Sequence, residues 1–408
     1  MPMDLLNKKV GILGGGQLSR MLAQAAQKMG LQCHIFCNSA DEPAAQVTAF
    51  CHILPKDLTH KKADTKQFMD WIHAQVPDLS ILTFESEFFN FSQTDIKTPF
   101  YIFPKIKTMH QLQFRTTQKT LLLENKIPTA PFFIIHNTAE LNQTITEFKI
   151  NQNPLVLKTA FGGYDGYGTF FLKNQDSCEQ VLNKASNYLN ESDQHCLIAE
   201  PMISFHQEQA LIAIRNKNSE TVFFPLVTTK QLHGRCDWVH GPSSHPKLEA
   251  LEKKIRLFLE KIDYVGAIGI ELFDCTINNK RELWVNELAP RVHNSGHYSQ
   301  DALNIDQFTA HWLAGLGMTM PTIMANSKQF AMMNLIGESN SAIQSPENIH
   351  TSISTGHLHL YAKKENRPGR KMGHLNLTVG EKKISSKKNQ TIPLLIQEGI
   401  KIRRRFRL

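Results

Sequence analysis

Two glutamates on neighbouring predicted strands are the first residues whose types and spacing indicate chemistry. Glu271 follows an apolar run and Glu287 lies in a second one, and the polar turn at residues 277–280 predicts that the two strands pair. A charged side chain among buried strand residues needs a partner. With the amide of Asn286, the two carboxylates offer the hard oxygen ligands that suit Mg²⁺, with substrate phosphates completing its coordination. The alternative is an antiparallel hairpin whose glutamates face water.

A lysine ahead of a glycine-rich segment is a second candidate. Lys158 lies in a predicted strand at residues 155–159, and four glycines follow between Gly162 and Gly168. Such a loop can close over nucleotide phosphates and exclude water, while the lysine contacts the phosphates. The alternative is a glycine-rich hairpin with an exposed lysine.

A shorter glycine run, Gly14 to Gly16, lies between an apolar strand and a helix that starts at Gln17. Free backbone N–H groups and the helix dipole at such a start favour a phosphate. The run is not the GxGxxG dinucleotide motif, because Ser19 stands where the third glycine is required. A tight turn without a ligand is the alternative.

Two dense polar clusters follow later in the chain. Both are rich in groups that donate hydrogen bonds to anions. A single histidine is more often structural than catalytic, so the density of each cluster carries the prediction. The first cluster is Arg291, His293, Asn294, Ser295 and His297, and the second is Arg370, Lys371 and His374.

The hydrophobic patterns that must position these residues predict an α/β fold. Strands alternate with helices over the first hundred residues, which predicts a parallel, doubly wound sheet. The expected helices are residues 17–29, 64–76, 106–124, 246–262 and 300–316. The expected strands are residues 9–13, 31–36, 79–84, 155–159, 170–172, 196–200, 209–215, 221–228, 265–273, 283–288, 358–361 and 374–377.

Length and composition set the class of protein. A chain of 408 residues suggests two or three domains, and 41% hydrophobic with 20% charged residues is typical of a globular protein. No apolar run approaches the ~20 residues that span a bilayer, and the first ten residues lack the apolar core of a signal peptide. This excludes a disordered, collagen-like or membrane-spanning class.

The formal charge of +8 belongs to the end of the chain. Residues 361–408 hold 14 Lys and Arg against 3 Glu, a net +11, so the first 360 residues sum to −3. This basic tail either meets an anionic ligand, a nucleic acid or an acidic partner, or is simply solvated.

The cysteines indicate a reducing compartment. Seven are scattered along the chain, an odd number without a CxxC pair, which predicts neither a disulfide framework nor a zinc site. A cytoplasmic location is the simplest expectation.

Five motifs run in order along the chain and together resemble one family. They are Gly-Ile-Leu-Gly-Gly-Gly-Gln-Leu at residues 11–18, Pro-Ala-Ala-Gln at 43–46, Gly-Tyr-Asp-Gly at 163–166, Asn-Glu-x-Ala-Pro-Arg-x-His-Asn-Ser-Gly-His at 286–297 and Pro-Gly-Arg-Lys-Met-Gly-His at 368–374. The set looks like the 5-(carboxyamino)imidazole ribonucleotide synthases, ATP-grasp enzymes of purine biosynthesis. The last two motifs distinguish this family within the ATP-grasp superfamily.

The resemblance implies an ATP-grasp fold in three parts. Residues 1–104 would form a Rossmann-like ribonucleotide-binding domain, residues 105–318 the ATP-grasp domain, and residues 319–408 a small β-rich domain with the basic tail. The implied reaction is the carboxylation of aminoimidazole ribonucleotide by bicarbonate and ATP, through carboxyphosphate. The implied partners are these small molecules and a second copy in a homodimer, with no nucleic acid and no membrane.

The resemblance also implies roles for residues that match the family's motifs. ATP would be bound by Arg115, Lys119, Lys158, Gly163, Tyr164, Asp165, Gly166, Tyr167, Gly168, Thr169, Glu200, Ile203, Glu208, Gln231, Asn286 and Glu287. Mg²⁺ would be bound by Glu271 and Glu287. The ribonucleotide would be bound by Gly15, Gly16, Gln17, Leu18, Glu85, Glu87, Asn294, Ser295 and Arg370. Catalysis would fall to Tyr164, Arg291, His293 and Lys371.

Three positions depart from the family pattern. Tyr167 stands where the family usually has Arg or Lys, residues 228–231 replace a Glu-Asn-x-His run, and Phe88 ends a run that is usually Glu-x-Glu-Asn or Glu-x-Glu-His. An arginine offers a fixed cation and a bidentate fork that a tyrosine lacks. The missing cation predicts weaker acceptor binding, unless Lys230 or Arg235 has taken over the role.

Two other functions stay open. One is an ATP-grasp ligase that acts on a different phosphorylated amine, which the Tyr167 and 228–231 departures favour. The other is a non-catalytic nucleotide-binding protein that binds a partner through its tail, and the pair of metal-type carboxylates argues against it.

Overall fold

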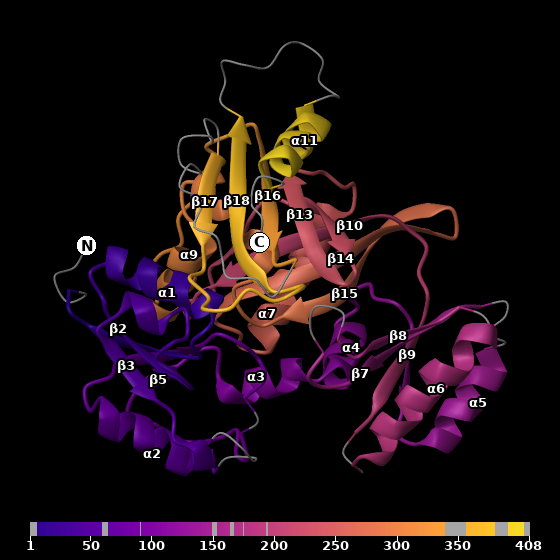
Figure 1. The fold of residues 1–408 in the computed structure, drawn as a ribbon, viewed down its shortest axis with the longest axis horizontal. Coiled ribbons are helices and arrows are strands. Elements are labelled where there is room, and N and C mark those ends of the chain that lie inside the picture. Colours follow the sequence, from indigo (N-terminus) through magenta and orange to yellow (C-terminus); the bar gives the residue numbers. More distant parts are fainter. Residues whose placement is uncertain are drawn as a thin grey trace.

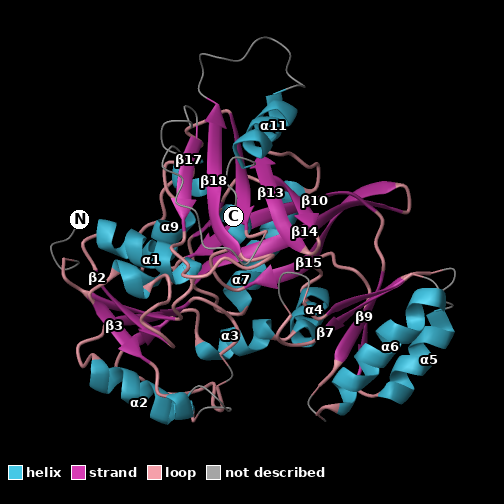
Figure 2. Cartoon of the chain, viewed as in Figure 1, coloured by secondary structure: helices cyan, strands magenta, loops and turns pink. Residues whose placement is uncertain are grey.

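Three sheets organise the described residues of the computed structural model (Figure 1, Figure 2). The structure describes residues 6–58, 64–89, 91–148, 153–163, 167–173, 175–192, 195–338, 356–379 and 391–403. No helix within these ranges is long and apolar enough to cross a membrane.

The first sheet is parallel and doubly wound, as the sequence predicts. Its described strands lie in the order β3-β2-β1-β4-β5, and helices α1 and α2 pack against it. The strands are β1 (Lys9–Leu13), β2 (Gln32–Cys37), β3 (Phe50–Ile53), β4 (Ile81–Phe84) and β5 (Tyr101–Ile102), and the helices are α1 (Gln17–Lys28) and α2 (Thr65–Gln75). The glycine turn after β1 and the acidic residues after β4 therefore meet at one edge of the sheet.

The second sheet is small and antiparallel, in the order β6-β9-β7-β8. Helices α5 and α6 lie together beside it (Figure 1), and Leu155 and Leu157 of β7 share their buried cluster. Since strand side chains alternate between faces, Lys158 of β7 points to the opposite face. The elements are β6 (Phe133–Ile135), β7 (Leu155–Thr159), β8 (Thr169–Leu172), β9 (Leu197–Pro201), α5 (Thr138–Phe148) and α6 (Gln175–Asn190).

The third sheet holds nine described strands, in the order β15-β14-β10-β12-β13-β16-β18-β17 with β11 paired to β10. The strands of the C-terminal segment continue this sheet rather than forming a sheet of their own, because β16 pairs with β13, β18 with β16 and β17 with β18. Its strands are β10 (Phe205–Arg215), β11 (Thr221–Phe223), β12 (Val227–Leu232), β13 (Arg235–Gly241), β14 (Gly266–Ile277), β15 (Lys280–Ala289), β16 (Gln329–Ile336), β17 (Gly356–Leu360) and β18 (Lys371–Val379). The remaining helices are α3 (Ile106–Gln113), α4 (Arg115–Glu124), α7 (Leu248–Lys261), α8 (Ser299–Ala302), α9 (Gln307–Leu316) and α11 (Thr391–Arg403).

Helix α9 joins the first sheet to the third. Trp312 is buried and donates its indole N–H to the Leu22 carbonyl of α1 at 2.9 Å. Nδ1 of His311 accepts from the Ala267 N–H of β14, so its Nε2 donates to the Thr83 hydroxyl of β4 at 2.8 Å. One hydrophobic cluster therefore includes residues of both sheets and fixes the position of one sheet relative to the other.

Three elements that the sequence predicts as continuous are interrupted in the structure, so these predictions are wrong. The helix expected at residues 106–124 is two helices, because Phe114 adopts an extended backbone and Arg115 N–H bonds to the Ala160 carbonyl. The strand expected at residues 221–228 stops before Pro225, which has no N–H for a strand ladder. The helix expected at residues 300–316 breaks before Asp306, which caps α9 through the N–H groups of its first turn.

The solvated-tail prediction is wrong for residues 391–403, which form helix α11. Leu395 and Ile402 are buried against β16 and β18, and Arg403 pairs with Asp237 of β13. Figure 1 shows the helix beside these strands. Arg404 and Arg405 lie outside the described residues.

Candidate active site

One glutamate and two lysines form a buried charged group where the second sheet faces helix α4. Glu200 of β9 pairs with Lys158 of β7 at 2.6 Å and with Lys119 of α4, and the three side chains are at most 10% exposed. Burial would raise the pKa of Glu200, but Lys158 and Lys119 outweigh it and lower the pKa. Burial lowers the pKa of Lys119 to about 8. The group keeps two cations dry and in place, as the binding of a polyphosphate requires.

The predicted pair of carboxylates exists. Glu271 of β14 lies directly opposite Glu287 of β15, and the register shifts immediately after this pair. The shift leaves Asn286 as the extra residue of a β-bulge, a feature that often re-aims side chains at active sites. Its amide donates to Glu271 at 3.3 Å and accepts from Lys158 at 2.9 Å, so the bulge links the carboxylates to the buried lysines.

Arg115 closes one side of this pair. Its guanidinium reaches both oxygens of Glu287 at 3.0 Å and also donates to the carbonyls of Thr159 and Gly163. A Cβ at Gly163 would collide with the Arg115 guanidinium, so this glycine is needed for the contact. The break between α3 and α4 therefore directs the side chain of Arg115 toward the two carboxylates.

The residues fit a divalent cation that prefers oxygen. Desolvation, together with the Glu287 and Glu208 carboxylates, raises the pKa of Glu271 to about 7. A bound Mg²⁺ would stabilise adjacent carboxylates whose negative charge the protein does not fully neutralise. In the described part of the chain, no group of three or more His, Cys, Asp and Glu side chains could hold a metal ion, so further ligands would come from amide, phosphate or water oxygens.

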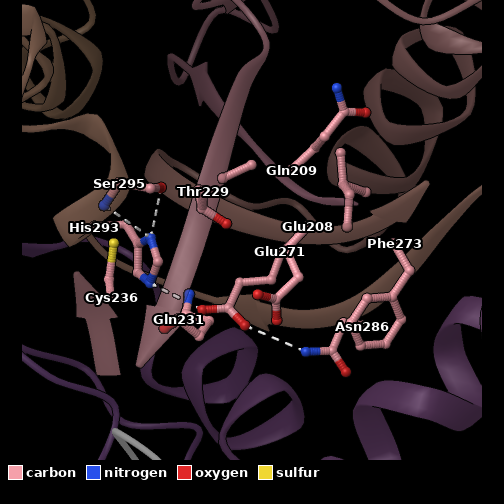
Figure 3. A pocket seen from close by; sticks show the side chains of 12 residues that line it. Glu208, Gln209, Thr229, Gln231, Cys236, Glu271, Phe273, Asn286, His293 and Ser295 are labelled. Atoms are coloured by element: carbon pink, nitrogen blue, oxygen red, sulfur yellow. Dashed lines mark hydrogen bonds and ion pairs between the residues drawn. The ribbon is translucent and has the colours of Figure 1, made fainter. Parts of the chain in front are cut away.

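His293 forms the far wall of the same pocket (Figure 3). Its Nδ1 accepts from the hydroxyl of Ser295 at 2.8 Å, so the Nε2 proton points toward Glu271, 3.7 Å away. Burial, with the Arg291 and Lys371 cations, lowers the pKa of His293 to about 3. A Cβ at Gly269 would meet the His293 ring at 2.5 Å, so this glycine lets the imidazole lie against β14.

The polar residues after β4 reach the site from the first sheet. Glu87 is buried and accepts from Nε of Arg291 at 2.6 Å. Glu85 accepts from the N–H groups of Gly16 at 2.7 Å and Leu18 at 3.1 Å. The N-terminus of α1, which the sequence offers to a phosphate, is thus occupied by a carboxylate of the protein itself.

The other predicted site residues divide into three groups. Glu208 of β10 lies opposite Thr229 of β12, and its carboxylate accepts from the main-chain N–H of Gln231, two residues further along β12. Ile203 is half-buried in the loop after β9. Asn294 is buried, and its amide exchanges hydrogen bonds with Asn334, while Arg370 donates to the Glu365 carbonyl. In the glycine loop Gly168 and Thr169 lead into β8 and Tyr167 is 67% exposed, whereas Tyr164, Asp165 and Gly166 lie outside the described residues.

Six residues that line the pocket were not among the predicted site residues, and two of them, Thr229 and Cys236, lie between its ends at Glu208 and His293. Both belong to the β12–β13 hairpin, whose two turn residues, His233 and Gly234, have positive φ. A His-Gly pair between alternating residues is a recognisable hairpin signal.

The comparisons with known proteins agree with this geometry. Family models match an ATP-grasp domain at residues 120–308, a phosphoribosylaminoimidazole carboxylase C-terminal domain at 331–388 and a ribonucleotide synthetase preATP-grasp domain at 7–113. An N5-carboxyaminoimidazole ribonucleotide synthase of Staphylococcus epidermidis is 31% identical, over 91% of this chain and 92% of its own length. The chain belongs to the N5-carboxyaminoimidazole ribonucleotide synthase family. It is an ATP-grasp ligase, and the resemblance drawn from the motifs is confirmed.

Solved synthases of the family share the whole fold. The Staphylococcus aureus enzyme complexed with ADP has a TM-score of 0.80 at 28% identity and covers 96% of this chain and 97% of its own. The Aspergillus clavatus enzyme in complex with ADP and 5-aminoimidazole ribonucleotide has a TM-score of 0.78 at 25% identity, over 98% and 99%. The predicted three-part ATP-grasp architecture is confirmed, while the boundaries at residues 104 and 318 stay predictions.

Proposed function

We propose that this synthase uses ATP and bicarbonate to carboxylate the exocyclic amine of 5-aminoimidazole ribonucleotide, releasing ADP and phosphate in purine biosynthesis. The carrying observation is that one pocket runs from Glu208 and Asn286, beside the buried lysines, to His293 and Ser295. A phosphorylated bicarbonate formed at the first end would reach an amine held at the second end without entering bulk water.

The ATP end is built for charge stabilisation. Phosphoryl transfer needs positioned cations more than covalent help from the protein. Lys158 and Lys119 supply two, and Arg115 supplies a third once a ligand competes for its contacts with Glu287. The glycine loop, including Gly163 and Gly168, covers the phosphates, and Ile203 and Glu208 contact the nucleoside.

Mg²⁺ is held by Glu271 and Glu287, with Asn286 as a neighbouring amide ligand. Bound there, it supplies charge neutralisation for the transferred phosphoryl group. The excess negative charge around Glu271 supports this assignment.

The acceptor end binds the ribonucleotide. His293 is neutral at physiological pH because burial lowers its pKa to about 3, so it donates a hydrogen bond through Nε2 instead of carrying charge. Arg291, oriented by Glu87, and Lys371 supply the positive field for the developing anion. The catalytic role of Tyr164, which lies outside the described residues, rests on the Gly-Tyr-Asp-Gly motif. Ser295 completes the ribonucleotide site, and the main chain of residues 15–18 joins it once the ligand competes with Glu85 for the N–H groups of Gly16 and Leu18.

Location and assembly follow the family. Six described cysteines are free thiols, which fits a reducing cytoplasm. A homodimer without nucleic-acid or membrane partners is the expected assembly.

Substrate-dependent release of ADP tests the function. The purified chain is incubated with ATP and Mg²⁺, with and without aminoimidazole ribonucleotide and bicarbonate, and other phosphorylated amines replace the ribonucleotide in parallel. We expect fast release only with the ribonucleotide and bicarbonate together. Faster turnover with another amine would favour a different ATP-grasp ligase, and binding of ATP without turnover a nucleotide-binding protein.

A further inference from the structure

Arg235 places a cation where the β12–β13 hairpin meets the turn before β18. A Cβ at Gly369 would lie 2.6 Å from Nη1 and 2.7 Å from Cζ of Arg235, so the guanidinium lies directly over this glycine. Gly369 has φ +78° and therefore both the conformation and the open side that a glycine provides. The next two residues of the chain are Arg370 and Lys371.

Arg235 is half-buried as a residue, and its guanidinium makes no hydrogen bond or ion pair within the described part of the chain. The neighbouring charged side chains, by contrast, are paired within the protein. Asp237, the nearest carboxylate along the strand, is paired with Arg403 of α11, and Glu365 is paired with Arg367. An arginine with five donors and no acceptor in a partly desolvated position indicates a binding partner that is not part of the protein.

The turn under Arg235 belongs to the acceptor end of the site. Gly369 N–H bonds to the Gly337 carbonyl, and Gly337 N–H bonds to the Arg370 carbonyl, which fixes the turn at the end of β16. The charge of Lys371, which starts β18, contributes to the lowered pKa of His293 in the pocket.

We propose that Arg235 binds the 5′-phosphate of the ribonucleotide acceptor and replaces the cation that Tyr167 lacks. The proposal rests on the proposed function. A phosphate monoester carries close to two negative charges and three acceptor oxygens, and a guanidinium binds such a group through two parallel hydrogen bonds. Arg235, Arg370 and Lys371 together form a cluster of cations around one turn, which a neutral ligand would not require.

Steady-state kinetics and equilibrium binding of Arg235→Met test the proposal. We expect the KM and the Kd for aminoimidazole ribonucleotide to rise about 10- to 100-fold, the loss of one charged hydrogen-bonding partner. The KM values for ATP and bicarbonate are expected to stay unchanged. Arg235→Lys, which keeps the charge but not the fork, should lie between the parent and Arg235→Met. Arg367→Met, which removes an arginine of the same turn that is paired with Glu365, is the matched control and should behave as the parent.

The dephosphorylated riboside identifies the group that Arg235 binds. If Arg235 binds the phosphate, the parent and Arg235→Met should bind the riboside equally. An equal loss for riboside and ribonucleotide, a rise in the bicarbonate KM, or an unchanged Kd in Arg235→Met would each overturn the proposal. A parent that neither binds nor carboxylates the ribonucleotide would overturn the proposed function as well, whereas an active parent with an indifferent Arg235 would overturn only this inference.

Discussion

The two ends of the pocket, which we propose bind ATP and the acceptor and call the ATP end and the acceptor end, present their charged groups in different ways. At the ATP end, the charged side chains Lys119, Lys158 and Glu200 come from regular elements and neutralise one another in a buried group. At the acceptor end, Arg291 and Arg370 lie in loops, and Arg235 and Lys371 are the first residues of their strands. Glu85 occupies the N-terminus of α1 that an anion would use. The charged side chains of the ATP end are paired and in place before a ligand binds. The charged residues of the acceptor end tolerate amino-acid substitution more readily.

The departures from the family pattern leave the buried charged groups intact, although the glycine loop and Gln231 also belong to the proposed ATP end. Tyr167 and residues 228–231 lie in the glycine loop and the β12–β13 hairpin, whereas the carboxylates and lysines of the ATP end are all present. A buried ion pair tolerates no single change, because the remaining charge would be left without a partner. A half-exposed cation on a turn can be replaced by a basic residue at another position of the sequence, provided that the new residue maintains the positive potential at the ligand.

Glu287→Gln is expected to have the largest effect on activity, because it removes one charge from the metal site. Turnover should fall about 100- to 1000-fold, ~3–4 kcal/mol as for other groups that stabilise transition-state charge. The control is Glu282→Gln on the same strand, which loses only a half-exposed pair with Lys247 and should keep parental turnover. Near-parental ATP turnover in Glu287→Gln would contradict the placement of the metal.

Glu200→Gln tests whether the ATP end depends on its buried pairing. The substitution leaves Lys119 and Lys158 without a counter-charge, and we expect the free energy of unfolding to fall by about 3 kcal/mol, measured by urea denaturation. Glu249→Gln, which breaks an exposed pair with Lys253, should unfold at the parental midpoint. Equal midpoints for all three proteins would mean that the group is not a source of stability.

Ile402→Ala asks whether the C-terminal helix belongs to the folded core. Ile402 is 6% exposed and packs on the third sheet, so its truncation should destabilise the protein by about 2 kcal/mol. Leu394→Ala, at a position on the same helix that is 58% exposed, is the control and should change stability little. If both variants melt at the parental temperature, α11 contributes nothing to the fold and the solvated-tail interpretation returns.

Tyr167→Arg is expected to have the smallest effect, and it tests directly whether the acceptor end lacks a cation. If Arg235 already supplies the cation, an arginine at position 167 should leave kcat/KM for the ribonucleotide unchanged or lower it through like-charge crowding. The measurement is kinetics with varied ribonucleotide at saturating ATP. A clear rise in kcat/KM would mean that the charge is missing altogether and that Arg235 does not replace it.

The sequence was sufficient where local pattern and chemistry coincide. The pairing of Glu271 with Glu287 follows from two apolar runs and a polar turn, and the first sheet follows from its alternation of strand and helix. It was insufficient where a long-range contact decides local structure. Phe114 breaks a helix because the next N–H bonds to Ala160 far along the chain. Helix α11 packs on β16 and β18 through apolar residues that lie in the sequence between two strongly basic stretches, so the overall charge of the tail conceals them.

The same limit applies to the site. The motif at residues 14–18 correctly marks a helix start with free N–H groups, but only the fold brings Glu85 to them. Arg235 is one arginine among many in the sequence, and its position over Gly369 depends on the pairing of β13 with β16.

Transfer of ¹³C from labelled bicarbonate to the ribonucleotide tests the central claim most directly. The chain is incubated with ATP, Mg²⁺, ¹³C-bicarbonate and aminoimidazole ribonucleotide, and the product is followed by NMR while ADP is measured in the same sample. The account predicts one labelled carbamate on the exocyclic nitrogen for each ADP formed, with Glu287→Gln forming both about 100- to 1000-fold more slowly. ADP formed in the presence of both substrates without label on the ribonucleotide would contradict it.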